Sequence, residues 1–286
     1  MQATTVQSAP IVTRPMTVRD LAAATELSQE QQWPHRIEDW ALFLKQGEGV
    51  AATRDGKVIG TILGWRFGED MARIGMVIVS PQYQRQGIGR NLTVQMLDRL
   101  ENRTVILSAT DVGLDLYQEL GFVESSGISQ YHGICRIVPL AELKSGERVR
   151  PKGQADAGLA DLYSAADGID RHAMFRVLAA ESRTVVYTRD NEAVGFAMMR
   201  RFGHGWVIGP VVAPNVSIAK ALILHWLAVK KDSFCRIDVT EESGLGPWVE
   251  GLGLTFAGSV RTMARGPAPK PGGPARVFAL AAQALG

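Results

Sequence analysis

The chain has 286 residues, of which 46% are hydrophobic and 21% charged, with a formal net charge of +2. Its length allows two domains with cores of their own, and its composition is that of an ordinary globular protein. The nearly balanced charge creates no general field for nucleic acid or a membrane surface, so we expect neither as a partner. Any attraction for an anionic ligand must therefore be local.

The cysteine content and the polar N-terminal residues argue against a disulfide-rich, metal-binding or secreted protein. Cys135 and Cys235 are too few for a disulfide framework or a metal cluster, and we expect both to be small buried side chains. Residues 1–10 lack the regions of a signal peptide and are expected to form a disordered lead. No apolar run reaches the ~18 residues of a membrane span. We expect a cytoplasmic protein; its oligomeric state is left open, a homodimer included.

The first half alternates strands and helices in chain order. A strand begins at Ile11, and Thr17–Asp20 resembles a capping box that opens a helix to about Gln32. A second amphipathic helix covers 33–44. Asp55-Gly56 is a hairpin signal. The remaining expected elements are strands over 49–53, 57–67 and 71–79, a helix to about 102, a strand over 104–109, a short helix over 113–120 and a strand pair over 122–138.

The second half repeats this order after a charged, Gly- and Pro-broken segment, residues 141–154, which we interpret as a linker between domains 11–140 and 155–286. Leu120-Gly-Phe-Val123 and Leu252-Gly-Leu-Thr255 each follow a short helix and precede a strand, which indicates an internal duplication. The spacing of apolar residues over 276–285 does not distinguish a strand from a helix. The expected elements are a helical region over 155–180, strands over 184–188, 193–199 and 205–213, a helix over 218–230, a strand over 235–239, a helix over 246–250 and a strand over 254–264.

The stretch from Val77 to Arg90 predicts a phosphate site. A β-branched strand is stopped by Pro81, and Gly87 and Gly89 stand where the next helix begins. Unpaired N–H groups and the dipole at a helix start favour an anion, and glycine lets a phosphate approach the backbone. Arg85 and Arg90 supply local positive charge. We therefore expect a phosphorylated cofactor here.

Two motifs in order resemble the GNAT N-acetyltransferases. Gln84, Gly87 and Gly89 match the acetyl-CoA signature of that family, Gln/Arg-x-x-Gly-x-Gly/Ala. Thr110–Phe122, with Tyr117 and Gly121-Phe122, is similar to its later helix motif, Asn-x-x-Ala-x-x-x-Tyr-x-x-x-Gly-Phe. The match covers about residues 11–138. The whole chain resembles a tandem subgroup, so the expected class is α/β (α+β), with two GNAT-like domains that each have a mixed, mostly antiparallel sheet flanked by helices.

The resemblance implies a role for each matched position. Acetyl-CoA would be the cosubstrate, and Tyr117 would protonate the departing thiolate, a reasonable role because phenol and thiol pKa values lie close together. Thr110 stands where the family often has Asn, and its hydroxyl would bond the pantetheine with less reach. The backbone of Val77, Ile78 and Val79 would pair with the pantetheine arm, and the pyrophosphate would be wrapped by residues 85–90, namely Arg85, Gln86, Gly87, Ile88, Gly89 and Arg90.

The general base and the acceptor site are less evident from the residues. Arg73 stands where some family members carry a carboxylate base, so a water chain or another residue would have to serve. Candidates are His35, Glu38 and Asp39, beside Trp33; the alternative for the three polar residues is an ordinary solvated helix end, and for Trp33 a core anchor.

The second half lacks the cofactor motifs. Pro214–Leu222 contains no Gly-x-Gly, and Trp248 and Val249 occupy the helix where a tyrosine would be expected. We expect this half to bind no cofactor and to cover the acceptor cleft. Three acidic residues that follow a buried strand, Asp238, Glu241 and Glu242, would then meet the acceptor, although a solvated acidic turn is the simpler interpretation. His204 and Trp206 could line the cleft as well.

Three hypotheses follow. The first is an acetyl-CoA-dependent N-acetyltransferase that acts by direct transfer on a small amine, such as an amino acid or a polyamine. The second is a non-catalytic sensor that binds acetyl-CoA. The third is an enzyme whose acceptor is a protein lysine or N-terminus.

Overall fold

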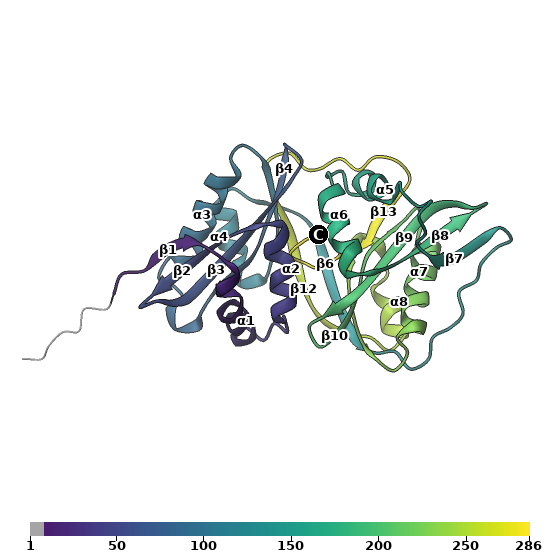
Figure 1. Ribbon diagram of the computed structural model, residues 1–286, viewed down its shortest axis with the longest axis horizontal. Helices are drawn as coiled ribbons and strands as arrows, with labels where there is room; N and C mark the ends of the chain where they lie inside the picture. The colour runs from purple at the N-terminus through teal and green to yellow at the C-terminus, as the bar shows by residue number, and fades with distance from the viewer. Residues whose placement is uncertain (1–8) are drawn as a thin grey trace, which may run out of the picture. The chain divides into compact units, whose positions relative to one another are not determined.

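The computed structural model describes residues 9–286 and divides into two compact units, each of which is described by itself (Figure 1). Unit 1 contains the chain up to Gly64 together with Ile74–Glu101, and unit 2 contains Trp65–Arg73 and Asn102–Gly286. All but the last two residues of the expected disordered lead, 1–10, lie outside the described residues. In the described part, no helix is long and apolar enough to cross a membrane.

Unit 1 is an antiparallel sheet covered by helices. Trp40 and Phe43 of one helix, and Leu92, Met96 and Leu100 of another, are fully buried. Its strands are β1 (Val12–Pro15), β2 (Glu48–Arg54), β3 (Lys57–Phe67) and β4 (Met71–Val79), the last two entering unit 2 at their connected ends, and its helices are α1 (Leu21–Glu30), α2 (Ile37–Gln46) and α3 (Ile88–Leu100). Helix α3 therefore lies where the helical spacing of its apolar residues predicted it.

Unit 2 is a longer mixed sheet with helices against it. Its strands follow the order β5-β12-β6-β11-β13-β10-β9-β8-β7, and Met71–Arg73 of β4 pair in parallel with β5. The strands are β5 (Thr104–Ala109), β6 (Val123–Ile134), β7 (Glu147–Pro151), β8 (Arg183–Arg189), β9 (Glu192–Phe202), β10 (Gly205–Ala213), β11 (Phe234–Thr240), β12 (Thr255–Arg265) and β13 (Arg276–Ala279). The helices are α4 (Leu114–Glu119), α5 (Leu159–Asp167), α6 (His172–Glu181), α7 (Val216–Val229) and α8 (Gly246–Gly251).

Strands from the two sequence halves alternate in this sheet. Strand β12, from the second half, lies antiparallel between β5 and β6 of the first half, and β6 lies between β12 and β11. The expected strand pair over 122–138 is therefore wrong. Val123–Ile134 forms one strand of 12 residues, because both of its partners come from the far end of the sequence.

A repeated ion pair confirms the internal duplication. Arg14 holds Asp20 through two hydrogen bonds of 2.9 and 2.6 Å, and Thr17 N–H donates to the same carboxylate at 2.8 Å. Arg150 and Asp156 repeat the arrangement at 2.7 and 2.8 Å, with Gly153 N–H at 2.7 Å. Each carboxylate is buried and accepts from a backbone N–H three residues earlier, which fixes the turn that follows β1 or β7.

Element lengths extend the correspondence. Strands β2, β3 and β4 have 7, 11 and 9 residues, and β8, β9 and β10 have the same three lengths. Helix α3 follows β4, and α7 follows β10. Strand β7, the counterpart of β1, lies inside the segment 141–154, so that part of the expected linker is a strand; the domain limits themselves stay predictions.

Three further expectations are settled by the structure. The helical region over 155–180 is two helices, because Gly168 ends α5 with a left-handed φ of +72°. The ambiguous segment after residue 275 is strand β13 followed by a turn. Cys135 and Cys235 are buried and free, as predicted, and burial raises the pKa of the Cys235 thiol to about 11.

Candidate functional site

The loop between β4 and α3 adopts the conformation of an anion-binding helix start. Gln84 Nε2 donates to the carbonyl oxygen of Val79 at 3.1 Å, which ties the loop to the end of β4. Arg85 and Gly87 have φ values of +57° and +76°. A Cβ at Gly87 would meet no atom within 4 Å, so the backbone conformation, and not crowding by the protein, favours glycine there.

Donors and positive charge meet at this loop. The first hydrogen bond of α3 joins Asn91 N–H to Gly87 O at 2.9 Å, so the N–H groups of Ile88 and Gly89 precede the helical ladder. The Arg85 side chain is exposed, and the Arg54 guanidinium lies over the Tyr83 ring at 5.7 Å. This geometry suits a phosphate or pyrophosphate. Gln86 and Arg90 are also exposed.

The end of β4 has backbone groups outside its ladder with β5, which contains only Met71, Ala72 and Arg73 of β4. Met76 has a φ of +53°, and its carbonyl oxygen accepts from Thr61 Oγ1 at 2.9 Å. After this irregularity come Val77–Val79, of which Ile78 is buried and its neighbours half-buried. An extended ligand can hydrogen-bond such backbone.

Tyr117 lies on α4, in unit 2. The side chain is 8% exposed, and its ring meets the Phe122 ring edge to face at 5.9 Å between centroids. Burial raises the pKa of Tyr117 to about 12, so the phenol stays protonated at neutral pH. A Cβ at Gly113 would lie 2.9 Å from the ring, which explains the glycine. Thr110 is exposed, and its carbonyl oxygen accepts from Gly113 N–H at 2.8 Å.

The acceptor candidates of unit 1 divide into two groups. Trp33 and His35 are half-buried, and the His35 ring makes edge contacts with the rings of Trp33 and Phe43, both at 5.9 Å. Asp39 is different. It caps α2, accepting from Arg36 N–H at 2.9 Å and from the Arg36 guanidinium at 3.1 and 2.9 Å. Because Asp39 is 1% exposed and bound in this way, we withdraw it from the acceptor site.

The acidic candidates of unit 2 do not form one cluster. Asp238 is fully buried inside β11, where it pairs with Arg236 through hydrogen bonds of 3.0, 3.2 and 2.9 Å. Glu241 is exposed and pairs with Arg261 at 3.3 Å. Glu242 is exposed beside it. Because Asp238 is fully buried and pairs with Arg236, we withdraw it from the acceptor site, whereas the role of Glu241 and Glu242 stays a prediction.

The aromatic candidates are also engaged. The ring of Trp206 carries Lys230 Nζ 3.5 Å from its centroid and the Arg201 guanidinium at 4.9 Å. His204 meets the Phe234 ring edge to face at 6.1 Å. These contacts stabilise the β10–β11 end of unit 2, and the expected role in the cleft stays a prediction.

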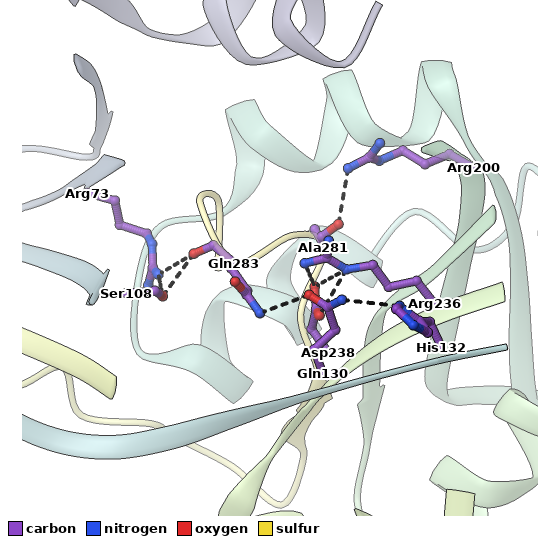
Figure 2. Close-up of polar contacts among 9 residues, drawn as sticks. All are labelled: Arg73, Ser108, Gln130, His132, Arg200, Arg236, Asp238, Ala281 and Gln283. Carbon is purple, nitrogen blue, oxygen red and sulfur yellow. Dashed lines mark hydrogen bonds and ion pairs between the residues drawn. The ribbon is translucent and has the colours of Figure 1, made fainter. Parts of the chain in front are cut away.

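Figure 2 shows a polar network that the sequence did not reveal. Arg73 donates to Ser108 Oγ at 3.1 Å and to the carbonyl oxygens of Gln283 and Ala284 at 3.2 and 3.4 Å. Ser108 Oγ donates to Gln283 O at 2.9 Å. The Gln283 side chain continues to Gln130 at 3.5 Å, beside the Arg236–Asp238 pair.

Arg73 carries a buried positive charge whose hydrogen-bond partners are neutral oxygens. Burial, with repulsion from Arg171, lowers the pKa of Arg73 to about 10. The guanidinium is thus protonated at neutral pH and is not a base. Among residues 9–286, no group of His, Cys, Asp and Glu side chains is placed to hold a metal ion.

Comparison with known proteins gives a consistent result for both halves. Models described as acetyltransferase (GNAT) domains match residues 12–141 and 159–279. A curated relative, the uncharacterized N-acetyltransferase YitH of Bacillus subtilis (strain 168), is 29% identical over 218 residues, which are 73% of this chain and 75% of that protein.

Solved structures share the two-domain fold. A putative acetyltransferase from Pyrococcus horikoshii has a TM-score of 0.81 at 19% identity and covers 100% of this chain and 99% of its own. A tandem GNAT protein from the clavulanic acid biosynthesis pathway has a TM-score of 0.64 at 13% identity, covering 91% and 100%. At these identities the likeness concerns the fold alone.

Proposed function

Because the chain belongs to the GNAT acetyltransferase family, with one such domain in each half, we propose that it transfers an acetyl group from acetyl-CoA to the amino group of a small molecule. The single observation that carries this proposal is the β4–α3 loop. There a left-handed Gly87 opens a helix whose first N–H groups precede the helical ladder, and Arg85 stands beside them.

The residues present fit acetyl-CoA in two places. Ile88 and Gly89 N–H groups with Arg85 suit the pyrophosphate, and the backbone of Val77–Val79 suits an extended pantetheine arm. Bound acetyl-CoA would supply the acyl group and a thiolate leaving group. The chain would supply binding, orientation and a proton.

In the proposed reaction, the nitrogen of a neutral amine attacks the thioester carbonyl, a C–N bond forms and the C–S bond breaks. A backbone N–H of β4 stabilises the developing oxyanion. Tyr117 Oη donates its proton to the departing sulfur and regains one from water. Its raised pKa, about 12, makes complete transfer less favourable than from an ordinary phenol. We therefore assign most of its effect to a hydrogen bond that strengthens as the sulfur becomes negative.

The attacking nitrogen loses its proton without a carboxylate on β4. Arg73 occupies that position, and a guanidinium with a pKa of about 10 accepts no proton at neutral pH. We assign the proton to solvent water, which predicts that activity rises with pH as the acceptor ammonium deprotonates. Residues 155–286 are proposed to contribute to acceptor recognition.

The proposal is tested by measuring CoA release from acetyl-CoA with a panel of amino acids, polyamines, other small amines and peptides. The expected result is release that requires one small amine, with the acetylated amine identified by mass. Tight binding of acetyl-CoA without turnover on any acceptor would favour the sensor. Turnover on peptides alone would transfer the function to a protein acceptor.

A further inference from the structure

In unit 2, strand β13 fills the space between two parallel strands. Strands β10 and β11 pair directly only at Trp206–Val207 with Cys235–Arg236. Beyond that point β13 runs antiparallel to β10, opposite Val211, Val212 and Ala213, and Ala279 also pairs with Val239 of β11. The last three residues of β10 thus have a strand of the same chain as their second partner.

The last three residues of β4, which correspond to these three residues of β10, are Val77, Ile78 and Val79. Strands β4 and β10 each have 9 residues, precede a helix, and begin a short parallel ladder at their first or second residue. The β4–β5 ladder also ends early, at Arg73. Val77–Val79 therefore correspond to Val211–Ala213. The backbone that we assign to pantetheine in the first half is paired with β13 in the second.

The N-termini of α3 and α7 also differ: that of α3 has no side-chain cap, and that of α7 is occupied by a side chain. The N-cap of helix α3 is Gly87, which has no side chain that could accept a hydrogen bond from the helix. The N-cap of helix α7 is Asn215, whose Oδ1 accepts from Ile218 N–H at 3.0 Å. Ile218 is the third residue of α7, so its counterpart in α3 is Arg90, whose N–H also precedes the helical ladder. An amide oxygen thus occupies, in the second half, one of the helix-start donors that would face a phosphate in the first half.

The segment after β13 is fastened by buried groups. Leu280 N–H donates to Asp238 O at 2.9 Å. Three arginines bind its carbonyl oxygens. Arg200 binds that of Ala281 at 3.1 Å, and Arg73 that of Gln283 (Figure 2). Arg73 also binds that of Ala284, and Arg171 that of Leu285 at 2.7 Å. A Cβ at Gly209 would lie 1.9 Å from Leu280 O, so this close approach requires a glycine.

We infer that the second half is a self-occupied copy of the cofactor site, in which β13 takes the place of pantetheine and the Asn215 side chain the place of a phosphate. The inference rests on the proposed function for the identity of the first-half ligand. It goes beyond loss of the glycine motif, because the strand edge would be closed even if the helix start were restored. In the second half, the position of the cofactor is therefore taken by the protein's own backbone and side chains, and no cofactor binds there.

Hydrogen exchange resolved to single amides tests this on the wild-type protein, with and without acetyl-CoA. The amides of Val211–Ala213 that face β13 should exchange at least ~100-fold more slowly than the corresponding amides of Val77–Val79 in the free protein. Acetyl-CoA should slow exchange in β4 and leave β10 unchanged. Fast exchange in β10 that acetyl-CoA slows would overturn the inference. No effect of acetyl-CoA on β4, with slow β10, would instead contradict the proposed function alone.

A pair of variants separates β13 from the rest of the fold. Gly209→Ala should displace the Leu280 carbonyl and speed exchange at Val211–Ala213 by ~10-fold or more. Gly251→Ala is the matched control, since a Cβ there meets nothing within 4 Å. Equal exchange in the two variants would show that β13 does not protect β10. Should Gly209→Ala fail to fold, the wild-type comparison decides.

Discussion

The Arg73 guanidinium donates a hydrogen bond to the carbonyl oxygen of Gln283 at 3.2 Å, although 210 residues separate the two in sequence. Arg73 is the last residue of β4 in the ladder with β5, and Gln283 lies beyond β13. Within unit 2, the bond joins β4 of the first sequence half to the last residues of the second half. It is one of several contacts that make the two halves interdependent.

Replacing Arg73 by methionine should destabilise the protein by ~2–4 kcal/mol. The apolar side chain keeps much of the volume but removes a guanidinium donor from the carbonyl oxygen of Ala284, and from that of Gln283, which keeps only Ser108 Oγ. Urea unfolding measures the loss. Arg136→Met, at an exposed position after β6, should change stability by less than ~0.5 kcal/mol. Equal effects of the two variants would show that the Arg73 bonds contribute nothing measurable.

Tyr117→Phe should lower kcat by ~100-fold and leave the Kd for acetyl-CoA nearly unchanged, because only the donor to the departing sulfur is lost. Steady-state kinetics and calorimetry give the two values. Tyr187→Phe is the matched control: this buried tyrosine also has a pKa raised to about 12, chiefly by burial, but bonds Glu147 on β7. An unchanged kcat in Tyr117→Phe would remove Tyr117 from the mechanism.

The Arg14–Asp20 pair should contribute stability that is lost in acid. Hydrogen bonds from Arg14 lower the pKa of Asp20 from 3.8 to about 2. A carboxyl whose folded pKa is lowered stabilises the protein above its unfolded pKa, and the contribution disappears as the pH falls through the folded value. Asp20→Asn should therefore cost about 1–2 kcal/mol at neutral pH and progressively less from pH ~4 to pH ~2.

Denaturant unfolding across that pH range provides the measurement for Asp20→Asn. Asp98→Asn, at an exposed position on α3, serves as the control and should show no such convergence with the wild type. A gap between Asp20→Asn and wild type that stayed constant down to pH ~2 would contradict the ion-pair account.

Local patterns in the sequence predicted most of the elements and the loop of the candidate site. The β-branched runs marked β3, β4 and β10, and the glycines with following helical spacing marked the start of α3. These features are visible locally because periodicity and turn chemistry act over a few residues. The assignment of acetyl-CoA to Gln84–Arg90 and of catalysis to Tyr117 stays a prediction.

Pairing between distant segments could not be predicted in the same way. Nothing within Val123–Ile134 indicates that its neighbours are β11 and β12, since strand partners are chosen by the whole sheet. The sequence favours Asp39 and Asp238 for an acceptor only when each is considered without its arginine partner, Arg36 or Arg236, with which it forms an ion pair. Both lie within three residues, so that signal was present in the sequence.

The account places one acetyl-CoA site in each chain, at the β4–α3 loop. Calorimetric titration with acetyl-CoA of the wild type, Gly87→Val and Gly56→Val tests this most directly. Gly56 is the matched control because it has the same φ of +76° and the same empty surroundings, in the β2–β3 turn. Both variants carry similar backbone strain, but only Gly87→Val places a side chain against the ligand.

The predicted result is one acetyl-CoA per chain for the wild type and Gly56→Val, and no measurable binding for Gly87→Val. Two acetyl-CoA molecules per wild-type chain, or unchanged affinity in Gly87→Val, would contradict the account.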